Sequence, residues 1–217
     1  INYWEKGLWD KPLLVFAFQM MLMLILGHVL ALTKTVNTII ERASRYCTST
    51  ARAAALVTFL TVIVSLFNWG LGLIFGAIFA RKIGEYASKK NIPIHYPIIG
   101  AAGYSGLMVW HGGISGSAPI KIAEQGHFMQ EQMGVISQDM TIFSSMNIVV
   151  SCILILILPA FMYLLGKRNK GGKIHLKAET IIQKNTELRG AEKIDHSKIA
   201  SYLFGGLIII YCFYKAV

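Results

Sequence analysis

Five long stretches without a charged side chain constrain this chain more than any other feature of its sequence. They cover residues 12–33, 53–80, 96–120, 140–166 and 199–214. A helix needs about 20 apolar residues to cross the hydrocarbon core of a bilayer, and each stretch is close to that length or longer. The chain is 54% hydrophobic and 15% charged, whereas about 25% of residues are charged in a typical soluble domain. The composition excludes an ordinary soluble protein and predicts an all-α polytopic membrane protein.

The formal net charge of +10 is explained by the loops between these stretches. Lys and Arg number four in residues 33–52, four in 81–95 and nine in 167–198, but only one in 121–139, where acidic residues outnumber them. Cytoplasmic loops of membrane proteins carry such an excess of Lys and Arg. The three basic loops are therefore predicted to be cytoplasmic. Aromatic side chains that could stack on bases are almost absent from 167–198, so no nucleic-acid partner is expected.

The second stretch, residues 53–80, is flanked by two equally basic loops, and a single crossing would put one of them outside. It is also longer than one span needs, and its middle reads Phe-Asn-Trp-Gly-Leu-Gly at 67–72. These features predict a re-entrant helical hairpin of two half-helices that enters and leaves on the cytoplasmic side, with Asn68, Gly70 and Gly72 at its tip. A single tilted helix is the alternative.

A second interruption is expected at residues 111–119, which contain three glycines and two serines. Glycine lowers helix propensity, and Pro119 suits the first turn of a new helix. A broken helix exposes carbonyl groups at one end and N–H groups at the other. Transporters use such ends to hold a coupling ion and a substrate carboxylate. The two interruptions are therefore predicted to form one binding site.

The remaining polar residues of the stretches receive structural interpretations. Thr58, Thr61 and Ser65 are expected to bond to carbonyl groups of their own helix. His28, in the same stretch as Gln19, is expected to bond to a neighbouring helix, with a proton relay as the alternative. No Asp or Glu lies inside any of the five stretches. Ion coordination by neutral oxygen atoms is therefore expected.

The glycines at 100, 103 and 106 recur at helical spacing. Small residues at this spacing let a neighbouring helix approach closely, so they predict a packing stripe. The cysteines at 47, 152 and 212 are too scattered for a disulfide framework or a zinc site, and are expected to pack without a chemical role.

Three sequence runs together resemble the short-chain fatty acid transporter family of bacterial inner-membrane carriers, over nearly the whole chain. They are Phe-Asn-Trp-Gly-Leu-Gly-Leu-Ile-Phe-Gly-Ala at 67–77, Gly-Gly-Ile-Ser-Gly-Ser-Ala-Pro at 112–119, and Asp-Met-Thr-Ile-Phe-Ser at 139–144 with Asn-Ile at 147–148.

The resemblance implies a fold similar to the ion-transporter superfamily, in which carriers are built from two inverted repeats. Residues 1–165 would be the first repeat, incomplete at its N-terminus, and 166–198 a cytoplasmic basic linker. Residues 199–217 would be the truncated first helix of a second repeat that lies outside this chain. Membrane lipid and a second copy in a homodimer are the other expected partners.

The resemblance also implies a binding site. Asn68 matches the asparagine of the hairpin tip in Na+-coupled relatives, and 115–117 match their hydroxyl-rich break, while Phe67 and Trp69 replace the flanking Ser and Thr. This more apolar tip suits a short aliphatic monocarboxylate. Na+ would be held by Asn68, Ser115 and Ser117, with H+ as the other coupling ion and no further cofactor. The predicted substrate-binding residues are Asn68, Trp69, Gly70, Gly72, His111, Gly112, Gly113, Ser115, Gly116 and Ser117.

The predicted function is a secondary transporter, not an enzyme, that moves short-chain fatty acids such as acetoacetate or butyrate across the bacterial inner membrane by alternating access. One alternative is a related carboxylate:cation symporter with another substrate. A membrane-embedded metalloenzyme using His28 and His111 is a second, although the paired His and carboxylate ligands typical of such enzymes are absent. A membrane scaffold without transport is a third.

Overall fold

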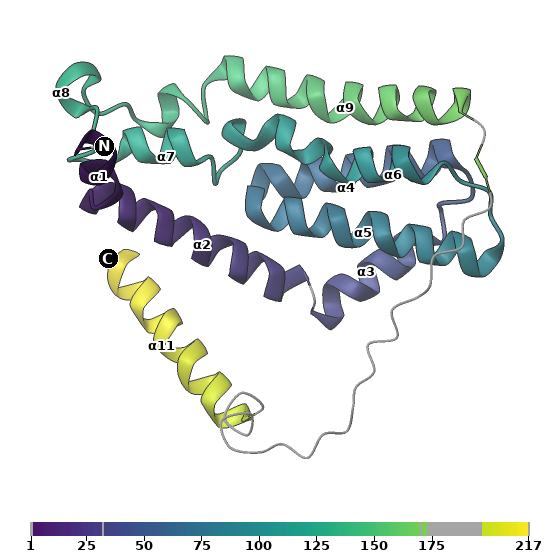
Figure 1. The fold of residues 1–217 in the computed structure, drawn as a ribbon, viewed down its shortest axis with the longest axis horizontal. Helices are drawn as coiled ribbons and strands as arrows, with labels where there is room; N and C mark the ends of the chain where they lie inside the picture. Colours follow the sequence, from purple (N-terminus) through teal and green to yellow (C-terminus); the bar gives the residue numbers. More distant parts are fainter. Residues whose placement is uncertain (1, 32, 170, 173–196, 217) are drawn as a thin grey trace. The chain divides into compact units, whose positions relative to one another are not determined.

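The computed structural model describes residues 2–31, 33–169, 171–172 and 197–216, and most of them are helical (Figure 1). No β-strand occurs in these described ranges, where one isolated bridge joins Ile94 to Gly172. The predicted all-α class is confirmed. The elements are α1 (Asn2–Leu8), α2 (Lys11–Ala31), α3 (Lys34–Ser44), α4 (Thr50–Phe67), α5 (Trp69–Lys90), α6 (Tyr96–Tyr104), the 3-10 helix η1 (Ser105–Gly112), α7 (Ser117–Ala123), α8 (Gln130–Met133), the 3-10 helix η2 (Gln138–Met140), α9 (Ser145–Arg168) and α11 (Lys198–Ala216).

Among the residues that the structure describes, three helices are long and apolar enough to cross a membrane by length and composition. They contribute the segments Lys11–Leu30 of α2, Thr50–Phe67 of α4 and Ser145–Arg168 of α9. Only 6% of the apolar window is buried in α2 and in α9, compared with 50% in α4. Two such exposed apolar helices need lipid or a partner around them, as expected for a membrane protein. The apolar part of α11, Lys198–Ile210, is shorter and belongs to a separate unit.

Helices α4 and α5 form an antiparallel hairpin in which Asn68 is the only residue between them. Ser65 lies against Gly72, and Thr61, one turn further from the connection, lies against Gly76. The stretch 53–80 therefore folds as two helices and not as one tilted helix. Helix α4 begins before this stretch, and its 18 residues extend about 27 Å at 1.5 Å per residue.

Helices α6 and η1 pack on this hairpin through glycines. A Cβ atom on Gly103 would lie 2.5 Å from the Gly76 carbonyl oxygen, and one on Gly106 would overlap the side chains of Ser65 and Thr61. A Cβ atom on Gly100 would meet nothing within 4 Å. The predicted packing stripe is therefore confirmed at two of its three positions.

The hydroxyl groups of α4 do not bond as predicted. Thr58, Thr61 and Ser65 are fully buried, and within the described part of the chain their Oγ atoms have no hydrogen-bond partner. The prediction that they bond to their own helix is wrong. The reason is clearest at Ser65, whose Oγ points into the space left by Gly72 and Gly106.

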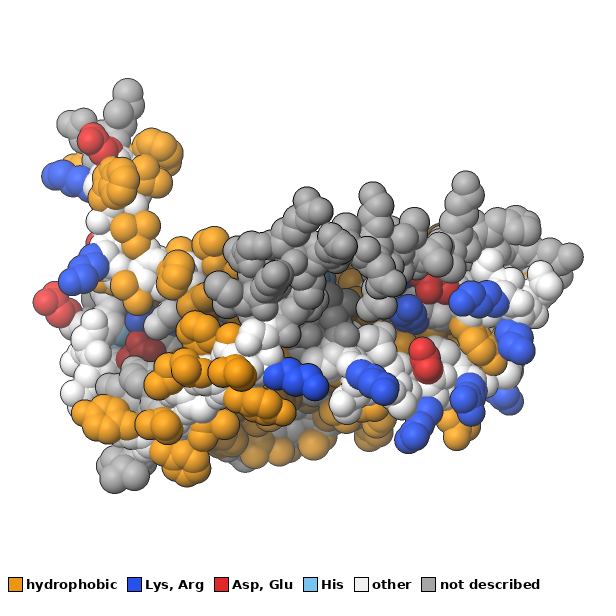
Figure 2. All heavy atoms as spheres, turned by 90° about the horizontal axis from the view of Figure 1, so that it is seen from below, with side chains coloured by type: hydrophobic (Ala, Val, Ile, Leu, Met, Phe, Trp, Pro, Cys, Tyr) orange, Lys and Arg blue, Asp and Glu red, His pale blue; other side chains and the backbone are white. Residues whose placement is uncertain are grey.

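The described parts of the three loops predicted to be cytoplasmic, which for the third include residues 167–169 and 171–172, meet at one end of the first unit. The backbone N–H of His95 donates to Thr50 Oγ1 at 2.9 Å, which joins the chain after α5 to the start of α4. Gly166 near the end of α9 packs against Ala51, and the Ile94 N–H donates to the Gly172 carbonyl at 3.2 Å. On the face in Figure 2, Lys and Arg side chains gather toward the end where α3 and the second half of α5 lie.

Cys47 precedes α4 and is completely buried in the core with Ile40, Val57, Phe79 and Ile83. Burial raises the pKa of the Cys47 thiol from 9.0 to about 12, so the thiol stays protonated at neutral pH. This agrees with its predicted packing role. Most of the predicted basic linker, residues 166–198, lies outside the described residues, as does residue 217 at the end of the predicted second-repeat helix.

Candidate functional site

The hairpin tip is built on Asn68, which ends one helix and begins the next. Its backbone N–H donates to the Val64 carbonyl at 2.8 Å, and its side-chain Oδ1 accepts the N–H of Leu71 at 2.8 Å. Asparagine is a favoured helix N-cap because its side-chain oxygen satisfies such an N–H. The predicted interruption is therefore one residue wide, and Gly70 and Gly72 lie in the first turn of α5 instead of in a broken segment.

The second interruption lies where the sequence predicts it. Helix η1 ends at Gly112, residues 113–116 are not helical, and α7 begins at Ser117 with Pro119 in its first turn. A Cβ atom on Gly113 would lie 2.5 Å from the Leu66 carbonyl oxygen, so only glycine permits this approach of break and hairpin.

The two interruptions are joined by two hydrogen bonds. The N–H of Ile114 donates to the Leu66 carbonyl at 2.8 Å, and the N–H of Trp69 donates to Ser115 Oγ at 2.9 Å. Leu66 is in the last turn of α4 and Trp69 is the first residue of α5, so both backbone groups lack a partner inside their own helices. The break therefore provides hydrogen-bond partners for the backbone groups of the hairpin tip that have none within their own helices.

A stack of three aromatic rings lies beside these bonds. The centroids of Trp69 and Trp110 are 4.5 Å apart, and those of Trp110 and His111 are 4.9 Å apart. Trp69 is 6% exposed, while His111 is exposed at the outer end of the stack. The indole N–H groups of both tryptophans are buried without a hydrogen-bond partner among the described residues. Trp110 was not predicted as a site residue, although it directly precedes the glycine-rich run.

Asn147 in the first turn of α9 fixes the other side of the break. Its Nδ2 donates to the Gly112 carbonyl at 2.9 Å and to the Ile142 carbonyl at 2.7 Å. The sequence contained this asparagine in a recognisable run but carried no signal for its partner 35 residues away.

A cavity of about 420 Å³ separates the hairpin tip from α2. Its lining has two polar side chains, Asn68 and Gln19, and is otherwise apolar. The side chains in this wall are Gln19, Leu22, Leu26 and Leu30 of α2, with Phe67, Asn68 and Leu71 of the hairpin. Gln19 was treated only as a structural polar residue from the sequence, because nothing in α2 indicates which helix it faces.

The predicted Na+ ligands are distributed around the tip. Asn68 Oδ1 and Ser115 Oγ each accept a backbone N–H, while Ser117 lines a different cavity with Pro12, Phe16 and Lys121. The ammonium group of Lys121 beside Ser117 also opposes a cation there. These three residues therefore do not line one common cavity. No group of three His, Cys, Asp or Glu that could hold a metal occurs among the described residues.

Comparison with known proteins identifies the group to which these features belong. The family described as "Short chain fatty acid transporter" matches residues 1–216. The chain belongs to this family. It is a transporter family and not an enzyme family.

Two curated relatives of this family carry the name "Putative short-chain fatty acid transporter". The relative from Escherichia coli K12 is 30% identical over 217 residues, which cover 97% of this chain and 48% of the relative. The relative from Haemophilus influenzae Rd is 30% identical over 231 residues, which cover 99% of this chain and 50% of the relative. The chain thus spans about half the length of these relatives. No solved structure matches it significantly.

Proposed function

We propose that this chain supplies half of a secondary transporter that carries short-chain fatty acids such as acetoacetate or butyrate across the bacterial inner membrane, by uptake or exchange. The cavity between α2 and the hairpin tip would receive the substrate. This proposal rests on the orientation of the Asn68 side chain, whose amide NH2 group is available to donate hydrogen bonds to a ligand.

Asn68 is suited to bind a carboxylate because its two amide atoms have different tasks. The Oδ1 atom accepts the Leu71 N–H, which orients the amide, and among the described residues Nδ2 has no hydrogen-bond partner. Nδ2 carries two N–H donors, and a carboxylate accepts such donors strongly. Gln19 brings a second amide to the same cavity from α2. Together they offer N–H groups to one carboxylate from two walls.

The rest of the cavity explains why the substrate would be short and carry one acidic group. Leu22, Leu26 and Phe67 provide an apolar surface for an alkyl chain, and no charged side chain is in the lining. Leaving a second carboxylate unpaired in such a site would cost several kcal/mol, on the order of the burial penalty of an ion. A related symporter for dicarboxylates is therefore disfavoured.

The hairpin is proposed to be re-entrant, with its tip inside the membrane. The uncharged part of α5 runs from Trp69 to Ala80 before Arg81 and Lys82 follow. Twelve residues of helix extend about 18 Å, less than the hydrocarbon core of about 30 Å. A tip at the far surface would draw these two cations and Glu85 into the core, at the cost of burying charge. Backbone groups at membrane depth also need partners, which Ile114 and Ser115 provide.

Transport would follow alternating access, with a second inverted repeat supplying the other half of the site and with homodimer formation as a further expectation. Coupling to Na+ or to H+ is our proposal for the energy source, but Asn68, Ser115 and Ser117 do not share one cavity that could hold the ion. The multi-pass topology would place the three basic loops in the cytoplasm.

Uptake of labelled butyrate into cells expressing the full-length protein tests this function, with Asn68→Asp as the decisive variant. Aspartate keeps the N-cap oxygen that α5 needs, but removes the amide donors and adds a charge that repels a carboxylate. We expect at least a tenfold loss of uptake at an unchanged amount of membrane protein, since two N–H bonds to a charged group are lost. Gln19→Glu should act in the same direction from the opposite wall.

Asn91→Asp is the matched control, because it makes the same chemical change at the exposed opposite end of α5. It should transport like the parent. Parental uptake by Asn68→Asp would refute the site, and absence of butyrate uptake in the parent protein would refute the function.

A further inference from the structure

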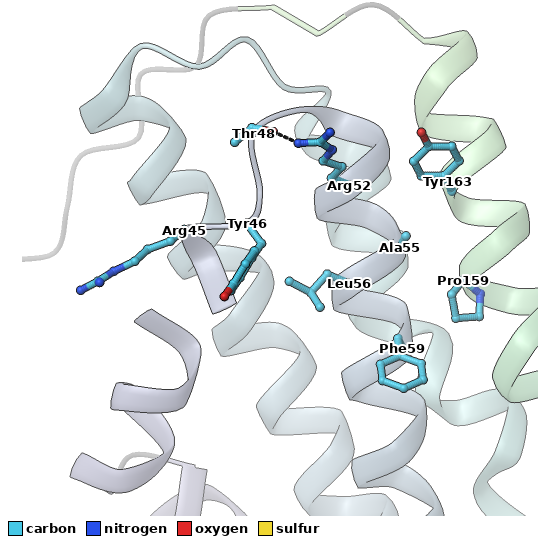
Figure 3. A pocket seen from close by; sticks show the side chains of 9 residues that line it. All are labelled: Arg45, Tyr46, Thr48, Arg52, Ala55, Leu56, Phe59, Pro159 and Tyr163. Atoms are coloured by element: carbon cyan, nitrogen blue, oxygen red, sulfur yellow. Dashed lines mark hydrogen bonds between the residues drawn. The ribbon is translucent and has the colours of Figure 1, made fainter. Parts of the chain in front are cut away.

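A second cavity, of about 610 Å³, lies at the end of the first unit where the basic loops meet. It opens between the start of α4, the loop before it, and the second half of α9 (Figure 3). It shares no residue with the cavity at the hairpin tip. Its chemistry is also different, because it combines cations and hydroxyl groups with an apolar floor.

Arg52 is the cation that faces this cavity. Its Nη1 donates to Thr48 Oγ1 at 3.1 Å, as drawn in Figure 3, and this bond holds the guanidinium at one end of the cavity. Within the described part of the chain Arg52 has no ion pair. A guanidinium has five N–H donors, so most of them remain for a ligand.

Arg45 and two tyrosines complete the polar side. Arg45 is a lining residue whose guanidinium extends away from the other labelled side chains, at the rim, and it also lacks an ion pair in the described ranges. Tyr46 and Tyr163 approach from the loop and from α9. Two cations and hydroxyl donors, with no acidic side chain among the described lining residues, favour an anion. Guanidinium groups match phosphate oxygens in geometry.

The floor of the cavity is apolar and continues toward the exposed side of α9. Leu56 and Phe59 of α4 and Pro159 of α9 line it, with Leu56 on the side of Tyr46. Along α9, Leu156 and Ile157 are 71% and 57% exposed. The cavity therefore passes from charged to apolar surface over about one to two helical turns, as the boundary between lipid headgroups and acyl chains does. Tyrosine is enriched at this boundary.

We propose that this cavity binds one anionic glycerophospholipid of the cytoplasmic leaflet. Its phosphate would bind the Arg52 guanidinium, with hydroxyl donors from Thr48 and the tyrosines, and Arg45 at the rim would add positive charge to the entrance. One acyl chain would lie along Phe59 and Pro159 and continue onto α9. Basic pockets between membrane helices on the cytoplasmic side are typical sites for acidic lipid headgroups. A bound lipid at this position would link the loop before the hairpin to α9.

Thermal unfolding of the full-length protein in a zwitterionic detergent, titrated with short-chain phosphatidylglycerol, tests the site. We expect a rise in the unfolding temperature that saturates, and an apparent affinity weakened about fivefold to tenfold in Arg52→Gln. Phosphatidylcholine and inorganic phosphate should produce little shift, because one lacks net charge and the other lacks the acyl chain.

Arg42→Gln is the matched control, since Arg42 is exposed on α3, has no ion pair in the described ranges and does not line the cavity. It should keep the parental lipid response, and Arg52→Gln without lipid should unfold at the parental temperature. An equal response to phosphatidylcholine, or a parental lipid response in Arg52→Gln, overturns the proposal. A shift with butyrate that disappears in Arg52→Gln also overturns it, and would assign the cavity to a small carboxylate.

Discussion

Helices α4 and α9 are both apolar enough to cross a bilayer, yet they have different surroundings. Half of the α4 window is buried within the protein, whereas only 6% of the α9 window is buried. Helix α4 is covered by α5, α6, η1 and α9, whereas α9 exposes bulky aliphatic side chains along most of its length. Mean hydropathy therefore identifies helices that tolerate a membrane, but does not tell which of them contacts lipid.

The composition of the two helices explains the difference. Helix α4 contains Ala51, Ala53 and Ala54 on buried positions together with buried threonines, and these small residues allow other helices to approach. Helix α9 is rich in Ile and Leu, which suit acyl chains as well as they suit a protein core. We expect α4 to return with α5 to the side where it began, and α9 to cross completely.

The largest expected effect is an all-or-none difference in accessibility between single-cysteine variants on a background without native cysteines. Thr48→Cys and Lys90→Cys, at the two ends of the hairpin, should react with a membrane-impermeant maleimide from the cytoplasmic side only. Lys167→Cys at the end of α9 should behave like them. Met140→Cys, before α9 and 73% exposed, should react from outside only.

Two outcomes of this labelling would contradict the proposed difference between the hairpin of α4 and α5, which returns to the side where it began, and α9, which crosses the membrane. Reaction of Thr48→Cys and Lys90→Cys from opposite sides would mean that the hairpin ends lie in different compartments. Phe67→Cys, which is 68% exposed at the tip, tests the depth of the hairpin. If it reacted from outside as readily as Met140→Cys, the tip would reach the outer surface and the hairpin would not be re-entrant.

A smaller effect is expected from the glycines that let α6 cover the hairpin. Gly103→Leu should lower the free energy of unfolding by about 3 kcal/mol or more, because its Cβ would meet the backbone of Gly76, which cannot move aside. Gly100→Leu, one turn earlier on the same helix, meets open space and should stay within about 1 kcal/mol of the parent. Denaturant unfolding of both variants in the same micelles measures the difference, and similar values would disprove the close contact.

The smallest expected effect is the change in stability caused by one added aromatic ring on α4 and on α9. Val57 of α4 is fully buried, so Val57→Phe should cost about 2 kcal/mol of stability through overpacking. Ile157 of α9 is 57% exposed, so Ile157→Phe should change stability by less than about 0.5 kcal/mol. Thermal unfolding of the two variants suffices. An equal loss in both would show that α9 is as closely packed as α4.

The positions of both interruptions could be predicted from the sequence, because local chemistry determines them. Asparagine followed by glycines at 68–72 disfavours one continuous helix, and the glycine-serine run before Pro119 does the same. The glycine stripe was predictable at 103 and 106 for a similar reason, since spacing on one helix is a local property. The loop charges also group three loops whose described parts meet at one end, while their cytoplasmic location stays a prediction.

Long-range contacts could not be predicted in the same way. The bond between Trp69 and Ser115 joins residues 46 positions apart, and the facing of Gln19 toward Asn68 depends on how α2 lies against the hairpin. The hydroxyl group of Ser65 in α4 could not be placed from the sequence, because its Oγ occupies the space left by Gly72 and Gly106 on other helices. The width of the first interruption was overestimated, because a side-chain cap at Asn68 lets Gly70 and Gly72 remain helical.

Asn147 has a consequence for any transport cycle. One amide group holds the end of η1 and the loop before α9 at the same time, and the adjoining break is bonded to both helices of the hairpin. The tip, the break and the first turn of α9 are therefore expected to travel as a single rigid body. The moving boundary of a cycle that preserves these bonds would then be the opposite wall, where α2 slides against the tip and Gln19 parts from Asn68.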